Sequence, residues 1–213
     1  MIRPLAPLVL ICLIAGCGES APPARAPAAE ANASAPAPRP VPDSARVRIE
    51  TGAGAIVVEL DGRHAPVTTA NFLAYVDQHR FDGTSFYRAA RTEGAEGRGF
   101  VQGGIRRDYR RMLPPIAHEP TSATGLSHRA GTISMARGES GAMGNFFITT
   151  AAMPSMDAHG REHGYAAFGH VVEGMDVVRH ILAAPTDPNA GSGAMRGQML
   201  ATPVPIVRAT RVE

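Results

Sequence analysis

Tryptophan is absent from this 213-residue chain, and only two of its residues are cysteines. Both of them, Cys12 and Cys17, lie in the first 17 residues, so the rest of the chain contains no thiol. That part can form no disulfide framework and holds no cysteine-based metal or nucleophilic site. Aromatic residues make up only 5% of the chain, so each phenylalanine that recurs in a motif is informative.

Charge and long hydrophobic runs are also scarce. The formal net charge is only +2, whereas nucleic-acid-binding domains are strongly basic, so we expect no nucleic-acid partner. The apolar run 5–15 is shorter than the roughly 20 residues that a membrane-spanning helix needs, and Pro7 interrupts it. Because Arg3 precedes this run, the pattern is typical of a secretory signal peptide.

The signal ends in Ile14-Ala15-Gly16-Cys17, which resembles the lipobox of bacterial lipoproteins. The resemblance implies a signal peptide over residues 1–16, cleavage before Cys17 and lipidation of that cysteine. An ordinary secretory signal with an incidental cysteine is the alternative. We expect a protein of the bacterial cell envelope that is bound to the periplasmic face of a membrane through its lipid alone. Gly18 in place of aspartate after the cysteine favours the outer membrane.

The next segment, 17–45, is rich in alanine, proline and small polar residues and has no apolar periodicity. Such a composition buries too little surface to offset the entropy of ordering, so we expect a disordered linker. The remaining residues, 46–213, have the length of a single domain, which we expect to be monomeric.

Short alternating runs dominate this domain. They predict a hairpin over 46–61 and strands over 85–88, 131–136, 145–149, 166–172 and 204–212, the last starting at a sheet edge because of Pro203 and Pro205. Apolar residues at helical spacing predict helices over 65–76 and 173–183. Many short strands with two helices favour a closed antiparallel barrel capped by helices, although periodicity alone does not exclude an α+β sandwich.

Six motifs make this prediction specific: Ala65–Phe72, Phe81–Arg88, Phe100–Gly104, Gly131–Ala136, Asn145–Ile148 and Phe168–Met175. In sequence and in order they resemble the motifs of the cyclophilin family, and they cover nearly the whole domain. The resemblance implies a mainly β fold, an eight-stranded antiparallel barrel capped by two helices, with a groove on its outer face. It also implies peptidyl-prolyl cis-trans isomerase activity on proline-containing unfolded or extended polypeptides, without a cofactor.

The resemblance places Arg88 in the catalytic role. Rotation about an X-Pro bond breaks amide resonance, and the proline nitrogen gains a lone pair at the twisted midpoint. A fixed, charged donor such as a guanidinium stabilises that state more than the planar ones. Reducing a 100-second event to about a millisecond requires roughly 7 kcal/mol of such stabilisation.

The remaining site residues follow from the same resemblance. A pyrrolidine ring needs a shallow apolar cup, with Phe147 as its floor and Phe100 and Met156 as its walls. Gln102 is expected to hydrogen-bond the substrate backbone, and Ala136 to lie where the peptide passes close to the sheet. The expected substrate-binding residues are Phe100, Gln102, Ala136, Asn145, Phe147, Met156 and Tyr165.

Several positions depart from the family pattern. The segment Ala89–Gly99 is longer than usual, so either Gly99 or Phe100 takes the place of the family's pocket phenylalanine. Asn145 replaces a glutamine, Tyr165 a histidine, and Ser155 the tryptophan that contacts cyclosporin. These changes keep open an alternative function, a proline-peptide binding or chaperone module with little turnover.

Other chemistry finds little support. His159 and His163 have the i, i+4 spacing of zinc ligands on a helix, but Gly160 and Gly164 oppose a helix there, so we expect no metal site. Ser134 and Ser140 lack the pattern of a nucleophile elbow, which argues against hydrolysis.

Overall fold

The computed structural model of the protein describes residues 41–138 and 141–212. The expected signal peptide, the lipidation site Cys17 and most of the expected linker lie outside the described residues. The chain divides into two units, Met1–Pro38 and Arg39–Glu213, and every described residue belongs to the second. Among these residues, no helix has the length and apolar character needed to cross a bilayer.

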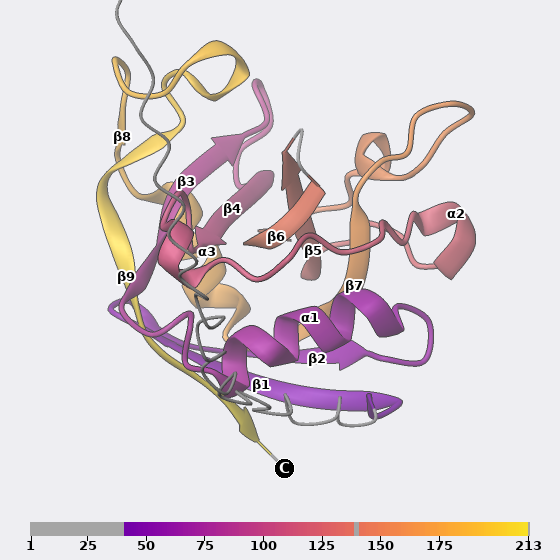
Figure 1. Ribbon diagram of the computed structural model, residues 1–213. Helices are drawn as coiled ribbons and strands as arrows, with labels where there is room; N and C mark the ends of the chain where they lie inside the picture. The colour runs from indigo at the N-terminus through magenta and orange to yellow at the C-terminus, as the bar shows by residue number, and fades with distance from the viewer. Residues whose placement is uncertain (1–40, 139–140, 213) are drawn as a thin grey trace, which may run out of the picture. The chain divides into compact units, whose positions relative to one another are not determined.

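The described residues form one antiparallel sheet that closes into a barrel (Figure 1). Its strands are β1 (Ser44–Thr51), β2 (Gly54–Asp61), β3 (Thr84–Arg91), β4 (Gly99–Gly104), β5 (Thr132–Gly138), β6 (Gly141–Thr149), β7 (Ala166–Glu173), β8 (Thr186–Asp187) and β9 (Met199–Val212). The order is β1-β2-β7-β5-β6-β4-β3-β9, and pairing of β1 with β9 closes the ring, while the short β8 adds to β9. The predicted eight-stranded barrel is confirmed.

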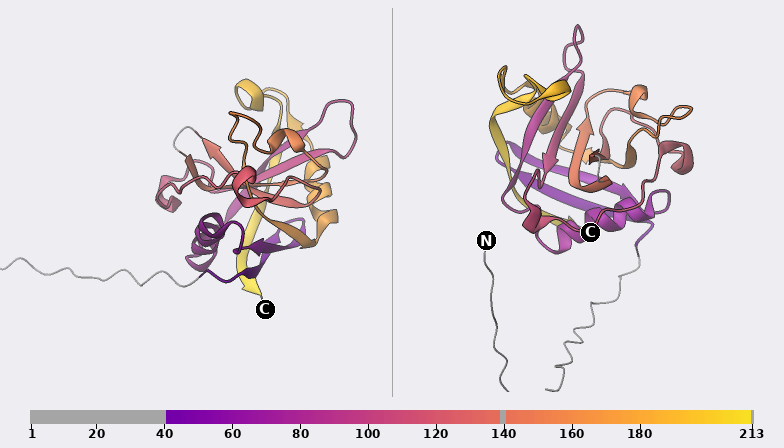
Figure 2. Two further views of the ribbon diagram at one scale, coloured as in Figure 1. Left: turned by 90° about the vertical axis from the view of Figure 1, so that its right-hand side faces the viewer. Right: turned by 45° about the horizontal axis from the view of Figure 1, so that its top comes forward.

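Two helices cover the barrel as predicted, and a third is a single turn. The three are α1 (Pro66–Asp77), α2 (Thr121–Thr124) and α3 (Met175–Ala183). In the left view of Figure 2, α1 and α3 lie on opposite sides of the strands. The predicted apolar faces of both helices are buried, as Phe72 of α1 and Ile181 of α3 illustrate. The four residues of α2 are too few to produce a periodic pattern.

Phenylalanines fill the inside of the barrel. The ring of Phe72 lies 5.0 Å from Phe81 and 5.3 Å from both Phe146 and Phe168, measured between ring centroids. Phe86 joins the same core, so five of the seven phenylalanines are used there. Because the interior is packed, a substrate site is left to the outside of the barrel, where Phe100 and Phe147 lie beyond the core cluster, Phe147 with only 2% of its surface exposed.

Strand β9 begins at Met199, five residues earlier than predicted, and it is not an edge strand. Between Ala201 and Pro205, however, only Val204 and Pro205 are in a ladder, and they pair with β3 alone, because the pairing with β8 involves Met199 and Leu200 and the pairing with β1 begins at Ile206. Pro203 and Pro205 fall in this part, where a missing N–H leaves no ladder bond unmade.

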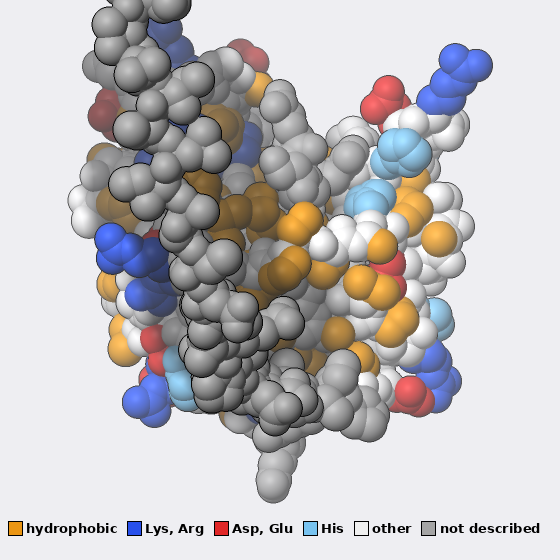
Figure 3. Space-filling model, viewed as in Figure 1, with side chains coloured by type: hydrophobic (Ala, Val, Ile, Leu, Met, Phe, Trp, Pro, Cys, Tyr) orange, Lys and Arg blue, Asp and Glu red, His pale blue; other side chains and the backbone are white. Residues whose placement is uncertain are grey.

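The connections extend beyond the barrel. The segment Ala89–Gly99 lengthens β3 and β4 into a hairpin whose turn, residues 92–98, projects from the barrel in Figure 2. The segment between β4 and α2 crosses the front of the molecule, and Met112, Leu113 and Ile116 pack from it against the core. Hydrophobic side chains gather over this crossing in Figure 3.

Candidate active site

A β-bulge in β3 brings two neighbouring side chains to the outer face. Phe86 pairs with Gly103 of β4 and Arg88 pairs with Gln102, so Tyr87 has no partner in the ladder. The register with β9 shifts at the same place. A bulge adds one residue and redirects the side chains that follow it. The side chain of Phe86 therefore stays in the core, while the side chains of Tyr87 and Arg88 both lie outside the barrel.

Two glutamines hold the guanidinium of Arg88. Its Nη1 donates to Oε1 of Gln102 at 2.9 Å, and its Nε and Nη2 donate to Oε1 of Gln198 at 2.9 and 2.7 Å. The guanidinium carbon lies 5.0 Å from the centroid of the Phe100 ring. Because a guanidinium has five N–H groups and three are used, two remain for a bound peptide. Burial lowers the pKa of Arg88, yet an arginine keeps its charge in proteins.

The side-chain nitrogen of Gln102 is held by Tyr87. Its Nε2 donates to the Tyr87 hydroxyl at 2.9 Å, and that hydroxyl lies 3.3 Å from Oδ1 of Asn145. Burial raises the pKa of Tyr87 to about 12, so the phenol stays protonated and can donate to Asn145. The chain of bonds orients the Gln102 amide and leaves its second N–H for a substrate carbonyl.

Phe100, Phe147 and Tyr165 form a cluster of aromatic rings beside Arg88, which we call the cup. Phe147 of β6 is opposite Gln102 in the ladder, and its side chain lies outside the core cluster. The ring centroid of Phe147 lies 5.2 Å from Phe100 and 5.2 Å from Tyr165, the latter edge-on. A proline ring binds to such an apolar surface by burial of its methylene groups.

Of Gly99 and Phe100, only Phe100 places a ring beside Phe147. Gly99 has φ +151°, and a Cβ added there would lie 2.1 Å from the carbonyl oxygen of Ala90. Gly99 therefore has no room for a side chain. Phe100 is the aromatic residue that contacts Phe147.

Three further predicted residues, Met156, Tyr165 and Ala136, belong to the surroundings of the cup. Met156, in the short helical turn η2 (Pro154–Met156), accepts a bond from the Tyr165 N–H at 2.9 Å, which places η2 beside the cup. Ala136 is half-buried at a bulge of β5, two residues after Ser134, which pairs with Phe147. Phe100, Gln102, Phe147, Met156 and Tyr165 thus lie together, and Ala136 lies on the neighbouring strand β5.

Asn145 lies in this site but is occupied by the protein itself. Its Oδ1 accepts from the Arg106 N–H at 2.7 Å, and its Nδ2 donates to the Arg106 carbonyl at 3.2 Å. The side chain therefore fixes the chain after β4, a role that the sequence did not predict.

His128, like Gln198, contacts the site residues but was not predicted from the sequence. Its ring is stacked on Phe147, with centroids 5.8 Å apart and planes inclined by 11°. Nδ1 lies 2.6 Å from Oδ1 of Asp157, and Nε2 lies 2.9 Å from Oγ of Ser134. Burial lowers the pKa of His128, partly opposed by Asp157, so a neutral ring that accepts from Ser134 fits the site. No sequence motif surrounds this loop histidine.

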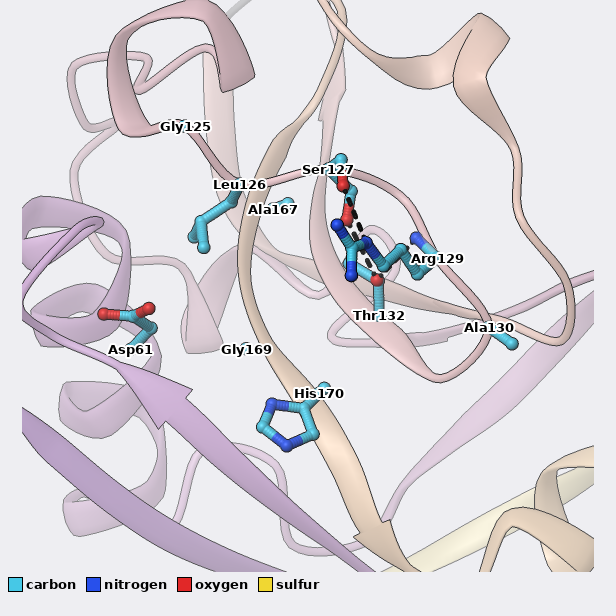
Figure 4. Close-up of a pocket in the computed structure, with 10 residues that line it drawn as sticks. All are labelled: Asp61, Gly125, Leu126, Ser127, Arg129, Ala130, Thr132, Ala167, Gly169 and His170. Atoms are coloured by element: carbon cyan, nitrogen blue, oxygen red, sulfur yellow. Dashed lines mark hydrogen bonds between the residues drawn. The ribbon is translucent and has the colours of Figure 1, made fainter.

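A separate cavity of about 380 Å³ opens behind the same loop. Asp61 of β2, Ser127 and Arg129 of the loop, and His170 of β7 line it (Figure 4). None of the predicted site residues lines this cavity. His128 stands between Ser127 and Arg129 in sequence but contacts Phe147 in the cup.

The outer-face site is suited to noncovalent chemistry. Ser134, whose hydroxyl bonds His128, is fully buried, out of reach of a peptide. Within the described ranges, no three histidine, cysteine, aspartate or glutamate side chains are grouped to hold a metal ion. A charged donor with two free N–H groups beside an apolar cup can bind and stabilise a twisted amide.

Comparisons with known proteins agree with this chemistry. The family model for the cyclophilin type peptidyl-prolyl cis-trans isomerase/CLD matches residues 46–210. Peptidyl-prolyl cis-trans isomerase A of Dickeya dadantii is 37% identical over 141 residues, which cover 64% of this chain and 70% of that protein. The peptidyl-prolyl cis-trans isomerase of Acinetobacter baylyi is 34% identical over 139 residues, 64% of this chain and 71% of that protein.

Among solved structures, a cyclophilin type peptidyl-prolyl cis-trans isomerase of Cryptosporidium parvum is similar with a TM-score of 0.62. The match covers 80% of this chain and 98% of that one, at 21% identity, and it shows a common fold. The same Cryptosporidium protein has been solved in the presence of the dipeptide Ala-Pro.

Proposed function

The chain belongs to the cyclophilin-type peptidyl-prolyl cis-trans isomerase family, and from that premise we propose that Arg88 catalyses X-Pro rotation in envelope polypeptides. The observation that carries the proposal is the guanidinium held by Gln102 and Gln198 beside the aromatic cup, with two N–H groups left over.

The proposed mechanism uses position and charge alone. Phe100 and Phe147 hold the proline ring while the preceding peptide group rotates about the C–N bond. As resonance is lost, the nitrogen lone pair localises, and an Arg88 N–H donates to it. Gln102 holds the substrate backbone on one side of the rotating bond. Since the lone pair exists only near the twisted geometry, this bond lowers the barrier more than it strengthens substrate binding.

We also propose that the enzyme is a lipoprotein of the bacterial envelope. The support is the sequence of residues 1–17: a charged start, a short apolar run, and small residues before Cys17. Substrates would then be proteins that fold or refold at the periplasmic face. Lipid attachment is tested by phase separation in detergent after expression in a bacterium. The full chain should enter the detergent phase, and Cys17→Ser should remain in water; a variant still bound to membranes would contradict lipid anchoring.

A refolding assay tests the activity. The full-length chain, purified in detergent, should accelerate the slow phase of a protein whose folding is limited by proline isomerisation, in proportion to enzyme concentration. The control is the same refolding reaction with buffer and detergent but without the enzyme. Binding of proline peptides without any acceleration would favour the alternative, a binding or chaperone module with little turnover.

A further inference from the structure

Arg106 has an unusual backbone conformation. Among the described residues, only His79 and Arg106 are non-glycine residues with positive φ, at 54° and 55°. His79 follows the end of α1, where left-handed residues are common. Arg106 instead follows the end of β4. A left-handed residue with a Cβ costs about 1 kcal/mol, so something in the structure must hold it.

Two side chains of the groove hold Arg106. The Asn145 amide bonds both the N–H and the carbonyl of Arg106, at 2.7 and 3.2 Å. The guanidinium lies over the ring of Tyr87, with its carbon 5.5 Å from the centroid. Tyr87 is in turn bonded to Gln102, and Gln102 to Arg88. The position of Arg106 is therefore tied to the proposed catalytic residue.

Arg106 lies beyond the end of β4, and its guanidinium lies over Tyr87, which is bonded to Gln102 beside the cup. Along β4, Val101 is buried in the core, so Phe100, Gln102 and Gly104 face outward, and the strand ends at Gly104. Gln102 is opposite Phe147, and Gly104 is opposite Asn145. From Gln102 to Arg106 the chain can advance about 14 Å at most. With the reach of its long side chain, Arg106 can meet a peptide residue two to four positions from the proline.

The guanidinium of Arg106 is available for a ligand. The side chain is exposed, and no described carboxylate forms an ion pair with it. The nearby Asp108 pairs with Arg111 instead, at 3.1 Å. Stacking on Tyr87 occupies the face of the guanidinium and leaves its edge, which carries the N–H donors, free to bind a carboxylate in a two-pronged fashion.

We propose that Arg106 is a specificity-determining residue that selects polypeptides with aspartate or glutamate two to four positions from the proline. The inference rests on the proposed function, because it assumes that the groove binds prolyl substrates. An exposed ion pair of this kind favours the acidic substrate about two- to fivefold at low ionic strength. The preference should fall with salt, because the Debye length shrinks from about 30 Å at 0.01 M to about 3 Å at 1 M.

The test uses matched peptide substrates that differ only in glutamate or glutamine at one position, two to four residues before or after the proline. The measured quantity is the ratio of kcat/KM for the two peptides, compared among the full-length protein, Arg106→Gln and Arg107→Gln. Arg107 is exposed and adjacent, so its variant makes the same charge change without touching Tyr87 or Asn145. Thermal unfolding confirms that each variant is folded.

We expect the ratio to be about two to five in the full-length protein, about one in Arg106→Gln, and unchanged in Arg107→Gln. A ratio of one in the parent, an unchanged ratio in Arg106→Gln, or an equal loss in Arg107→Gln would overturn the proposal. Fluorescence anisotropy of the same labelled peptides measures binding directly. If no peptide is turned over, the isomerase mechanism fails, while a binding preference that depends on Arg106 would still support selection of acidic peptides.

Discussion

Oε1 of Gln198 accepts two hydrogen bonds from Arg88, one from Nε at 2.9 Å and one from Nη2 at 2.7 Å. One acceptor shared by two donors of a planar group fixes the plane of that group. Gln198 lies just before β9, 110 residues after Arg88, and outside every family motif found in the sequence. The orientation of the proposed catalytic donor thus depends on the C-terminal part of the chain.

Replacing Gln198 tests this dependence. Gln198→Met keeps the size of the side chain and removes the acceptor, which should lower kcat about three- to tenfold, the equivalent of about 1 kcal/mol for a lost hydrogen bond. KM should change little, because the cup is untouched. Steady-state kinetics on a prolyl peptide measures kcat and KM separately. A rise in KM at constant kcat would instead assign Gln198 to substrate binding.

Arg88→Ala removes the donor itself. The isomerisation rate should fall about a hundredfold or more, roughly 2.7 kcal/mol, because no other described side chain presents a cation to the cup. The measurement is the catalysed rate of proline-limited refolding, with circular dichroism as the control for folding. Arg88→Lys keeps the charge but not the fork of donors and should recover only part of the rate. Parent-level catalysis by Arg88→Ala would remove Arg88 from the mechanism.

Cyclosporin should inhibit this enzyme weakly. The chain has no tryptophan, and Ser155, at the position that resembles the family's tryptophan, is an exposed residue of η2. Losing an indole N–H and its apolar face costs on the order of 3 kcal/mol, which is more than a hundredfold in affinity. Turnover should persist, because Arg88 and Phe147 remain. Titration of the drug into the refolding assay measures this, and half-inhibition at nanomolar drug would show that another residue replaces the indole.

Acid should weaken the fold through His128. Burial lowers its pKa in the folded protein below the value of about 6.5 in the unfolded chain. Between these two values the unfolded state binds more protons, so the free energy of unfolding decreases as pH falls below about 6.5, by at most about 1.4 kcal/mol per pH unit. Below the folded pKa this contribution levels off.

Urea unfolding at a series of pH values tests the role of His128. His128→Gln should flatten the slope below about pH 6.5, whereas His170→Gln, at an exposed histidine, should leave it as in the parent. Equal slopes in the parent and His128→Gln would place the acid sensitivity elsewhere.

The sequence predicted the barrel well because its signals are local. Alternation along 46–61 identifies the first hairpin, and the observed register pairs Val47 with Val58 as a tight turn after Thr51 requires. The helix face with Phe72 at its centre was predicted for the same reason. The start of β9 was missed because Pro203 and Pro205 resemble a strand edge, and only the structure shows that Pro203 has no ladder partner and that Pro205 pairs with β3 alone.

Only those site residues that lie within the family motifs were predicted. Arg88, Gln102 and Phe147 come together as the family resemblance implied, because the motifs carry their order and register. His128 and Gln198 act on these residues from a loop and from a distant segment, and no local pattern indicates such contacts. The occupation of Asn145 by Arg106 depends on a single left-handed residue, which an arginine in a sequence does not signal.

The bulge at Tyr87 joins the proposed active site directly to the hydrophobic core. Phe86 is fully buried in the core, and Arg88 is two residues away on the same strand. No flexible loop separates the donor from the barrel, so local opening cannot release it before the strand itself separates. As denaturant is added, catalysis and global unfolding should therefore be lost in a single transition, and the amide protons of β3 should be among the last to exchange with solvent.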